Sequence, residues 1–264
     1  MEGEPTSAER ELRSVEGDLR RLRATAEPTV PAEAYAGLEL AARAPASRPY
    51  TIANMVCALD GRATIAGRSG GLSSKADQAV FAALRSQVDA ILVGTGTLGA
   101  ERYGAPARTP DARASRRAAG LAERPLVVTI SRSLNLPLDI PLFADPATRI
   151  VVYTASEREP EPSAAQVEVI KQPHVLSGPA AALADLRRDR GVRSILCEGG
   201  PRLLGALVAA DLLDELFLTL SPTLVGGSGV TILHASELDP PRALELESAF
   251  EGDGDLFLRY SVRR

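Results

Sequence analysis

The clearest chemical signal in this chain is a carboxylate followed by two glycines and a proline. Glu198, Gly199 and Gly200 end an apolar run over 195–197, and Pro201 opens a second apolar run with helical spacing. Proline suits the first position of a helix, where its missing N–H has no partner to lose. Paired glycines let a bulky ligand approach the backbone, and the free N–H groups of a helix start bind phosphate. The segment predicts a nucleotide-phosphate site beside an acidic residue. A helix start whose glycines serve only packing explains this segment equally well, because the G-x-G-x-x-G fingerprint is absent.

Three further segments, over 54–62, 90–97 and 126–132, also consist of an apolar strand followed by a polar turn. The carboxyl ends of parallel strands lie along one edge of a sheet, so one long ligand could lie across all of these turns. Each turn alone is better explained as an ordinary loop or helix start, but together they favour a dinucleotide, with phosphates at the second and fourth turns. Arg132 follows the third strand, where an arginine could pair with a 2′-phosphate and favour NADPH over NADH.

The composition argues against several other functions. The 264 residues are 45% hydrophobic and 24% charged with a net charge of −4, which gives no electrostatic reason to expect a nucleic-acid partner. Cys57, Cys197, His174 and His234 have neither disulfide nor zinc-site spacing, so we expect no metal. The chain contains no G-x-S-x-G elbow, so the sequence does not indicate a serine hydrolase. No apolar run approaches the ~20 residues of a membrane span and no signal peptide is visible, so we expect a cytoplasmic protein without membrane contact.

The chain divides into an N-terminal extension over 1–47 and one globular domain over 48–264. Thr6 and Glu9 have capping-box spacing, and apolar residues then recur at helical spacing up to Leu22. This pattern predicts one short amphipathic helix that ends near Pro28 and Pro31. It is too short for a stable coiled coil alone, so we expect it to dock on its own domain or on a second subunit.

Strand and helix patterns alternate along the rest of the chain. Strands are expected over 50–59, 90–93, 126–130, 150–153, 167–170 and 194–197, and helices over 73–87, 180–190 and 203–210. The final apolar runs over 215–220 and 255–260 have no helix between them and suggest antiparallel edge strands. The predicted fold is α/β, a mixed, mostly parallel sheet flanked by helices, with antiparallel C-terminal edge strands. Residues 104–124 lack clear periodicity and are predicted to form a long loop.

The ordered set of motifs over 49–262 resembles the reductase domain of bacterial riboflavin biosynthesis, which also occurs as stand-alone enzymes. The matching runs are A-L-D-G-R at 58–62, L-R at 84–85, D-A-I-L-V-G-T-G-T at 89–97, E-G-G at 198–200, L-L-D-E-L at 212–216, and S-P at 221–222 with V-G-G at 225–227. The resemblance implies a dihydrofolate-reductase-like fold, a homodimer and NADPH as cofactor. It implies reduction of the ribosylamino group of a pyrimidine ribose phosphate, 5-amino-6-(5-phosphoribosylamino)uracil, to a ribitylamino group.

The same resemblance assigns roles to individual residues. The implied substrate contacts, with Glu198 also as the catalytic residue, are Asn54, Ser69, Arg85, Arg108 and Glu198. Arg85 and Arg108 suit a clamp on the substrate's phosphate. The implied cofactor contacts are Val56, Gly71, Gly94, Thr97, Glu101, Ser131, Arg132, Gly199, Gly200, Pro201, Arg202, Leu203, Leu204 and Gly205.

Three positions depart from the family's pattern and leave the substrate open. Asn54 stands where many members have lysine, Gly71 replaces a tryptophan, and Glu101-Arg102-Tyr103 replaces Asp-Asp-Pro. The alternatives are a reductase of dihydrofolate-like pteridines or other imines, and a catalytically silent NADPH-binding protein. A deaminase activity is not expected, because neither H-x-E nor P-C-x-x-C occurs in the chain.

Overall fold

The computed structural model describes residues 28–174 and 178–264, and residues 31–264 form one compact unit. The amphipathic helix predicted between Thr6 and Leu22 lies outside the described residues. Within them, no helix is long and apolar enough to cross a bilayer. Cys57 and Cys197 are both buried as free thiols.

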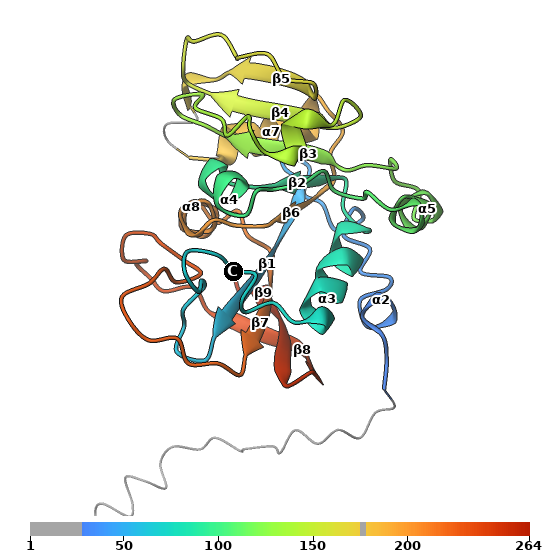
Figure 1. Cartoon of the computed structure of the whole chain (residues 1–264), viewed down its shortest axis with the longest axis vertical. Helices are drawn as coiled ribbons and strands as arrows, with labels where there is room; N and C mark the ends of the chain where they lie inside the picture. Colours follow the sequence, from blue (N-terminus) through green and yellow to red (C-terminus); the bar gives the residue numbers. More distant parts are fainter. Residues whose placement is uncertain (1–27, 175–177) are drawn as a thin grey trace, which may run out of the picture. The chain divides into compact units, whose positions relative to one another are not determined.

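The described residues form one sheet of nine strands, stacked in Figure 1 from β5 at the top to β8 at the bottom. The order across the sheet is β5-β4-β3-β2-β6-β1-β7-β9-β8. The strands are β1 (Tyr50–Ala58), β2 (Ala90–Leu92), β3 (Leu126–Ile130), β4 (Arg149–Thr154), β5 (Gln166–Lys171), β6 (Ser194–Cys197), β7 (Glu215–Ser221), β8 (Leu244–Gly252) and β9 (Asp255–Val262). Every strand predicted from the sequence is present.

The strands from β5 to β7 are all parallel, and only β9 and β8 run antiparallel at the edge. The predicted fold class is therefore confirmed, with one refinement. The run over 215–220, expected to belong to the antiparallel edge, forms β7, which is parallel to β1 and antiparallel only to β9. Alternation of side chains is the same in both kinds of strand, so it does not reveal the direction of pairing.

Helices cover both faces of the sheet. Buried leucines of α7 (Ala180–Arg188) and α8 (Pro201–Ala209) pack on one face. On the other face, α3 (Lys75–Arg85) packs with residues around α2 (Pro31–Ala34), and α4 (Thr95–Ala100) packs with α6 (Pro141–Ala144). Side chains alternate between these cores along each central strand, as expected for a sheet that is buried on both sides.

The segment over 104–124 is not the continuous loop that was predicted, because it contains α5 (Pro110–Ala118). Thr109 caps this helix by accepting a hydrogen bond from the Ala112 N–H, and Pro110 occupies its first turn. Its buried residue is Arg116, which is 1% exposed and donates to the carbonyl oxygens of Arg85 and Val88. The helix buries a cation instead of an apolar stripe, and hydrophobic periodicity therefore does not detect it.

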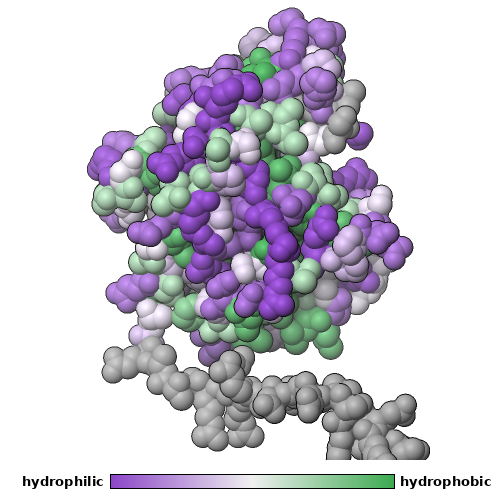
Figure 2. All heavy atoms as spheres, turned by 180° about the vertical axis from the view of Figure 1, so that it is seen from behind, coloured by the Kyte–Doolittle hydropathy of each residue, from purple (hydrophilic) through white to green (hydrophobic). Residues whose placement is uncertain are grey.

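Figure 2 shows the rear face, where hydrophilic side chains dominate and hydrophobic ones gather at the lower edge. Among the described residues, Leu224 and Leu59 are the most exposed large apolar side chains, at 77% and 59%. Leu244, Leu246 and Leu256, on β8 and β9, are also exposed. Exposed apolar side chains grouped on a folded domain are candidate association surfaces.

Candidate functional site

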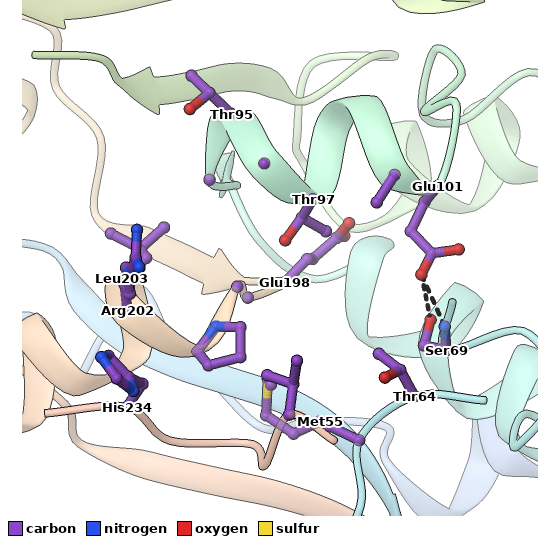
Figure 3. Close-up of a pocket in the computed structure, with 18 of the residues that line it drawn as sticks. Met55, Thr64, Ser69, Thr95, Thr97, Glu101, Glu198, Arg202, Leu203 and His234 are labelled. Carbon is purple, nitrogen blue, oxygen red and sulfur yellow. Dashed lines mark hydrogen bonds between the residues drawn. The ribbon is translucent and has the colours of Figure 1, made fainter. Parts of the chain in front are cut away.

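A cavity of about 1100 Å³ lies along the carboxyl edge of the parallel strands (Figure 3). Its walls include the turns after β2, β3 and β6, as the sequence predicted. The turn after β1 does not line it, and residues 54–56 within β1 do. The reason is strand length, since Ala53 pairs with Cys197 at the end of β6 and β1 continues beyond that point. Two loops, over 63–73 and 228–234, complete the walls.

The turn after β1 holds those two loops together. The Asp60 carboxylate accepts hydrogen bonds from the N–H groups of Gly226 and Val225 at 2.6 and 2.9 Å, and from that of Arg62. The Gly226 N–H, followed by those of Arg62 and Val225, lowers the pKa of Asp60. The Ala63 N–H donates to the Val230 carbonyl at 2.8 Å. Asp60-Gly61 thus connects the walls of the cavity and does not contact its interior.

The turns after β2 and β6 meet at glycines. The Gly94 N–H donates to the Gly199 carbonyl at 2.8 Å, and the Gly199–Gly200 peptide is cis. A Cβ at Gly200 would lie 2.8 Å from Oγ1 of Thr97, and Gly199 has a φ of +84°. A Cβ at Gly200 would force the Thr97 side chain to move, and the positive φ of Gly199 disfavours any other residue there. The result is an open backbone surface between the first turns of α4 and α8, which suits a phosphate.

Helix α8 also supports the far wall of the cavity. A Cβ at Gly205 would lie 2.2 Å from the His234 carbonyl oxygen, and the His234 N–H donates to the Pro201 carbonyl at 3.0 Å. The loop over 228–234 therefore packs directly on the helix backbone. His234 lines the cavity from this loop, as Figure 3 shows.

Glu198 lines the cavity and belongs to a polar cluster whose other members, Arg85 and Tyr103, lie behind it. Its two carboxylate oxygens accept from Nε and Nη2 of Arg85, both at 2.7 Å, and from the Tyr103 hydroxyl. The Arg85 guanidinium lies 3.9 Å from the centre of the Phe81 ring. Burial, followed by the neighbouring Glu198 charge, raises the pKa of Tyr103 well above its usual value. The Tyr103 phenol is therefore neutral, and its O–H donates a hydrogen bond to the Glu198 carboxylate.

Glu101 and Ser69 form a second polar contact, on the opposite wall. The Ser69 N–H and hydroxyl both donate to Oε1 of Glu101, at 2.7 and 3.0 Å (Figure 3). This contact joins the loop over 63–73 to the end of α4. Two residues that the sequence assigned to different ligands thus contact each other.

Asn54 places a buried hydrogen-bond acceptor at the cavity. It is 9% exposed and lines the cavity, and its side-chain oxygen Oδ1 is buried without a hydrogen-bond partner. A buried acceptor without a partner costs about 1–3 kcal/mol. A bound molecule with an N–H or O–H group at this point would remove that cost.

The cavity carries positive charge at one end. Arg132, after β3, and Arg202, in the first turn of α8, are exposed side chains that line it. Ser131 is buried beside Arg132, and Gly178 and Pro179 also line the cavity. Asp77, Ser73 and Thr64 line the other end. Among the described residues that line that end, none is an arginine or a lysine.

The structure brings most of the predicted site residues to this one cavity. The predicted residues that line it are Asn54, Val56, Ser69, Gly94, Thr97, Glu101, Ser131, Arg132, Glu198, Gly199, Gly200, Pro201, Arg202 and Leu203. Five others do not line it. Arg85 lies behind Glu198, and Arg108 is exposed. Leu204 is in the core, Gly205 faces His234, and Gly71 faces Ile65.

Several lining residues were not predicted, namely Thr64, Ser73, Asp77, Thr231 and His234. They come from loops and from the start of α3, and no local pattern indicates that these segments meet. Tyr103 was noted only as a departure from the family, and its contact with Glu198 joins residues 95 positions apart. In residues 28–174 and 178–264, no three His, Cys, Asp or Glu side chains gather as a metal site requires.

Comparison with known families gives a match over most of the chain. Residues 49–258 match the RibD C-terminal domain. The 2,5-diamino-6-ribosylamino-4(3H)-pyrimidinone 5′-phosphate reductase of Archaeoglobus fulgidus is 28% identical over 184 residues, which cover 68% of this chain and 83% of that protein. The protein of the same name from Methanothermobacter thermautotrophicus is 26% identical over 224 residues, 82% of this chain and 99% of that one.

Solved structures share the fold. A pyrimidine reductase-like protein from Corynebacterium diphtheriae has a TM-score of 0.72 at 23% identity and covers 89% of this chain and 100% of its own. A bifunctional deaminase and 5-amino-6-(5-phosphoribosylamino)uracil reductase from Thermotoga maritima has a TM-score of 0.66 at 21% identity. The match covers 82% of this chain and 57% of that protein.

Proposed function

The chain belongs to the RibD C-terminal domain family of riboflavin biosynthesis, and from this premise we propose that it is an NADPH-dependent pyrimidine reductase. The proposed reaction reduces the ribosylamino group of 5-amino-6-(5-phosphoribosylamino)uracil to a ribitylamino group. The 2,5-diamino compound named for the archaeal relatives carries the same ribosylamino phosphate on a pyrimidine ring with an amino group in place of the uracil oxygen at C2. One observation carries the proposal: a single cavity joins the glycine turns predicted for the cofactor to Asn54, Ser69 and Glu198.

The residues present fit a dinucleotide phosphate cofactor. The space beside Gly200 is one that a Cβ would fill, and it opens at the start of α8, where backbone N–H groups are free to bind phosphate. Arg132 and Arg202 at the positive end would contact the 2′-phosphate that distinguishes NADPH from NADH. When bound, NADPH supplies the hydride.

The substrate would lie at the end of the cavity that carries Glu198, Asn54 and Ser69. The Asn54 oxygen, which has no partner within the protein, would accept a hydrogen bond from an N–H or O–H of the substrate. Glu198 would accept a second hydrogen bond beside it. Hydride addition at C1′ of the imine form of the ribosylamino group, with a proton from water at its nitrogen, gives the ribitylamino product.

The phosphate clamp predicted for Arg85 and Arg108 needs revision within this proposal. Arg85 uses Nε and Nη2 to bind Glu198 and Tyr103, and Arg108 lies away from the cavity. Neither arginine lines the cavity, so the proposed phosphate contact is the hydroxyl of Thr64, which does. A homodimer is part of the proposal, and the exposed leucines of β8 and β9 support it.

The decisive experiment follows NADPH oxidation with the uracil and diamino pyrimidine phosphates in parallel, with dihydrofolate as the comparison substrate. We expect turnover with a pyrimidine and none with dihydrofolate. Turnover of dihydrofolate but of neither pyrimidine would mean that the substrate is a pteridine. Binding of NADPH without any turnover would support a silent cofactor-binding protein and reject the proposed reaction.

A further inference from the structure

Tyr103 stands out because it buries a hydroxyl beside the proposed active site without contacting the cavity. Its side chain packs in the hydrophobic cluster between α4, α6 and the sheet and is 8% exposed. Its N–H donates to the Leu98 carbonyl at 2.9 Å, and its own carbonyl accepts from Leu142 at 3.0 Å. The backbone is therefore held at both atoms, and the side-chain hydroxyl donates to Glu198.

The donors around Glu198 define what its carboxylate can do. Arg85 supplies two N–H groups and Tyr103 supplies one O–H, so three of about four acceptor positions are occupied. Arg85 is itself held, because its Nη2 lies 2.6 Å from the Tyr103 oxygen and its plane stacks on Phe81. A carboxylate that accepts three hydrogen bonds has one acceptor position left for a ligand.

Simple stabilisation does not explain this cluster well. A buried ion pair contributes little net stability, because the cost of desolvating both charges offsets their attraction. A phenylalanine at 103 would fill the same hydrophobic space without burying a hydroxyl. The tyrosine instead donates to the residue whose backbone forms the cavity wall between β6 and α8.

We propose that Tyr103 is a positioning residue that, together with Arg85, fixes the Glu198 carboxylate in one orientation as a hydrogen-bond acceptor for the substrate. This inference rests on the proposed function, and it makes Glu198 an acceptor and not the proton donor of the reaction. It also gives a role to the third of the residues that depart from the Asp-Asp-Pro pattern of the family.

The test compares two isosteric substitutions, Tyr103→Phe and Tyr153→Phe. Tyr153 is a matched control, because it is also fully buried and donates to a carboxylate, Asp185 at 2.6 Å, but does not line the cavity. We expect Tyr103→Phe to lower kcat about tenfold, the effect of losing one hydrogen bond to a charged group, with the Kd for NADPH unchanged. Tyr153→Phe should leave kcat and that Kd as in the wild type.

One further readout separates positioning from packing in Tyr103→Phe. In a Glu198→Gln background the same substitution should have little further effect on kcat, because the two residues act as one unit.

Equal kcat values for the two phenylalanine variants would overturn the inference, as would full additivity in the Glu198→Gln background. If Tyr103→Phe does not fold, Arg85→Lys tests the orientation of the same carboxylate. Lysine keeps the positive charge but cannot donate two parallel hydrogen bonds. An unchanged kcat in Arg85→Lys would overturn the inference as well. Failure of the proposed function is recognised separately, because a wild-type enzyme inactive on both pyrimidines removes the premise before any variant is compared.

Discussion

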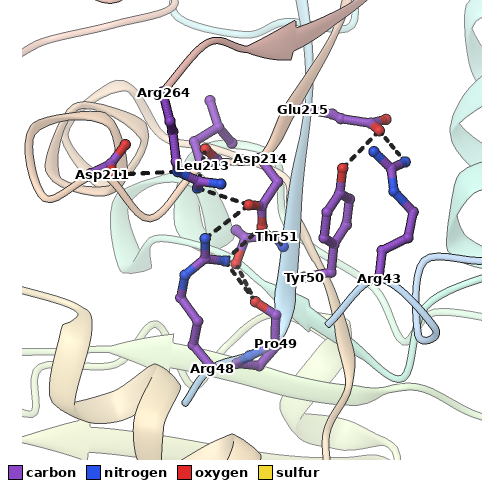
Figure 4. A network of polar contacts seen from close by, with 10 residues as sticks. All are labelled: Arg43, Arg48, Pro49, Tyr50, Thr51, Asp211, Leu213, Asp214, Glu215 and Arg264. Atoms are coloured by element: carbon purple, nitrogen blue, oxygen red, sulfur yellow. Dashed lines mark hydrogen bonds and ion pairs between the residues drawn. The ribbon is translucent and has the colours of Figure 1, made fainter. Parts of the chain in front are cut away.

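Two sites at opposite edges of the sheet differ in how their buried polar groups are bonded. At the amino edge, Asp214 and Glu215 are buried and every partner comes from the chain itself (Figure 4). At the carboxyl edge, Asn54 has a buried oxygen without a partner, and Arg132 and Arg202 are exposed along a cavity. A polar group whose bonding positions are filled by the chain has none left for a ligand, whereas one left unsatisfied is available to a ligand.

The amino-edge network ties together segments far apart in the sequence. Asp214 accepts from Arg48 at 2.6 and 2.8 Å and from Arg264 at 2.8 Å. Glu215 accepts from Arg259 at 2.8 and 3.0 Å, from the Tyr50 hydroxyl at 2.9 Å and from Arg43. Burial opposes ionisation of both carboxyls, but these donors outweigh it and lower the pKa of each. The segment before β1 and the C-terminal strand β9 are thereby joined to β7.

The largest expected effect is on this network. Glu215→Ala leaves two arginines and a tyrosine without their acceptor at a fully buried site, so the free energy of unfolding should fall by about 3–5 kcal/mol. Chemical denaturation measures the loss. Glu168→Ala, which removes a surface partner of Arg190, is the control and should cost at most about 1 kcal/mol. Equal losses would mean that burial does not distinguish the two sites.

A smaller effect, on binding, is expected at the carboxyl edge. Gly200→Ala places a Cβ 2.8 Å from Oγ1 of Thr97 in the proposed phosphate site. We expect the Kd for NADPH to rise at least about tenfold, the cost of displacing one charged hydrogen bond. Gly70→Ala is the control, because no atom lies within 4 Å of its added Cβ and Gly70 does not line the cavity. An unchanged Kd for Gly200→Ala, measured by fluorescence titration, would place the phosphates elsewhere.

The positive end of the cavity should affect cofactor choice. Arg132→Ala should raise the KM for NADPH about tenfold or less and leave the KM for NADH unchanged, because only NADPH carries the 2′-phosphate. Steady-state assays with both cofactors measure this split. Arg158→Ala removes an exposed arginine from the segment between β4 and β5 and should change neither value. Equal losses for both cofactors in Arg132→Ala would contradict the assignment.

The smallest expected effect concerns Asp255, a buried carboxyl without an arginine. Burial is the main cause that raises its pKa, and its Oδ2 has no partner. The folded protein therefore holds this proton more tightly than the unfolded chain, so Asp255 destabilises the fold as pH rises through its folded pKa. Asp255→Asn should give a small gain in stability at pH 7 that disappears below the unfolded pKa. A loss of stability at pH 7 in thermal unfolding would show that the carboxylate is needed.

This contrast explains what the sequence could and could not predict. The turn from β6 to α8 was predicted because an apolar run, two glycines and a proline follow one another in the chain. The pairing of Arg85 with Glu198 crosses 113 positions, so no local pattern indicates it. The same holds for Asp60, whose turn was predicted but whose partners lie 165 positions away. Local signals identified the elements and the edge, and long-range contacts decided which side chains are free there.

The contact between Gly205 and His234 has a consequence for how the protein opens. The carbonyl of His234 occupies the space where any other residue at 205 would place its Cβ, and the His234 N–H bonds to the first turn of the same helix. In amide hydrogen exchange, we expect the first turn of α8 and the loop over 228–234 to become exposed together, as one cooperative unit. A cofactor held by the helix alone would then slow exchange in a loop that it does not touch.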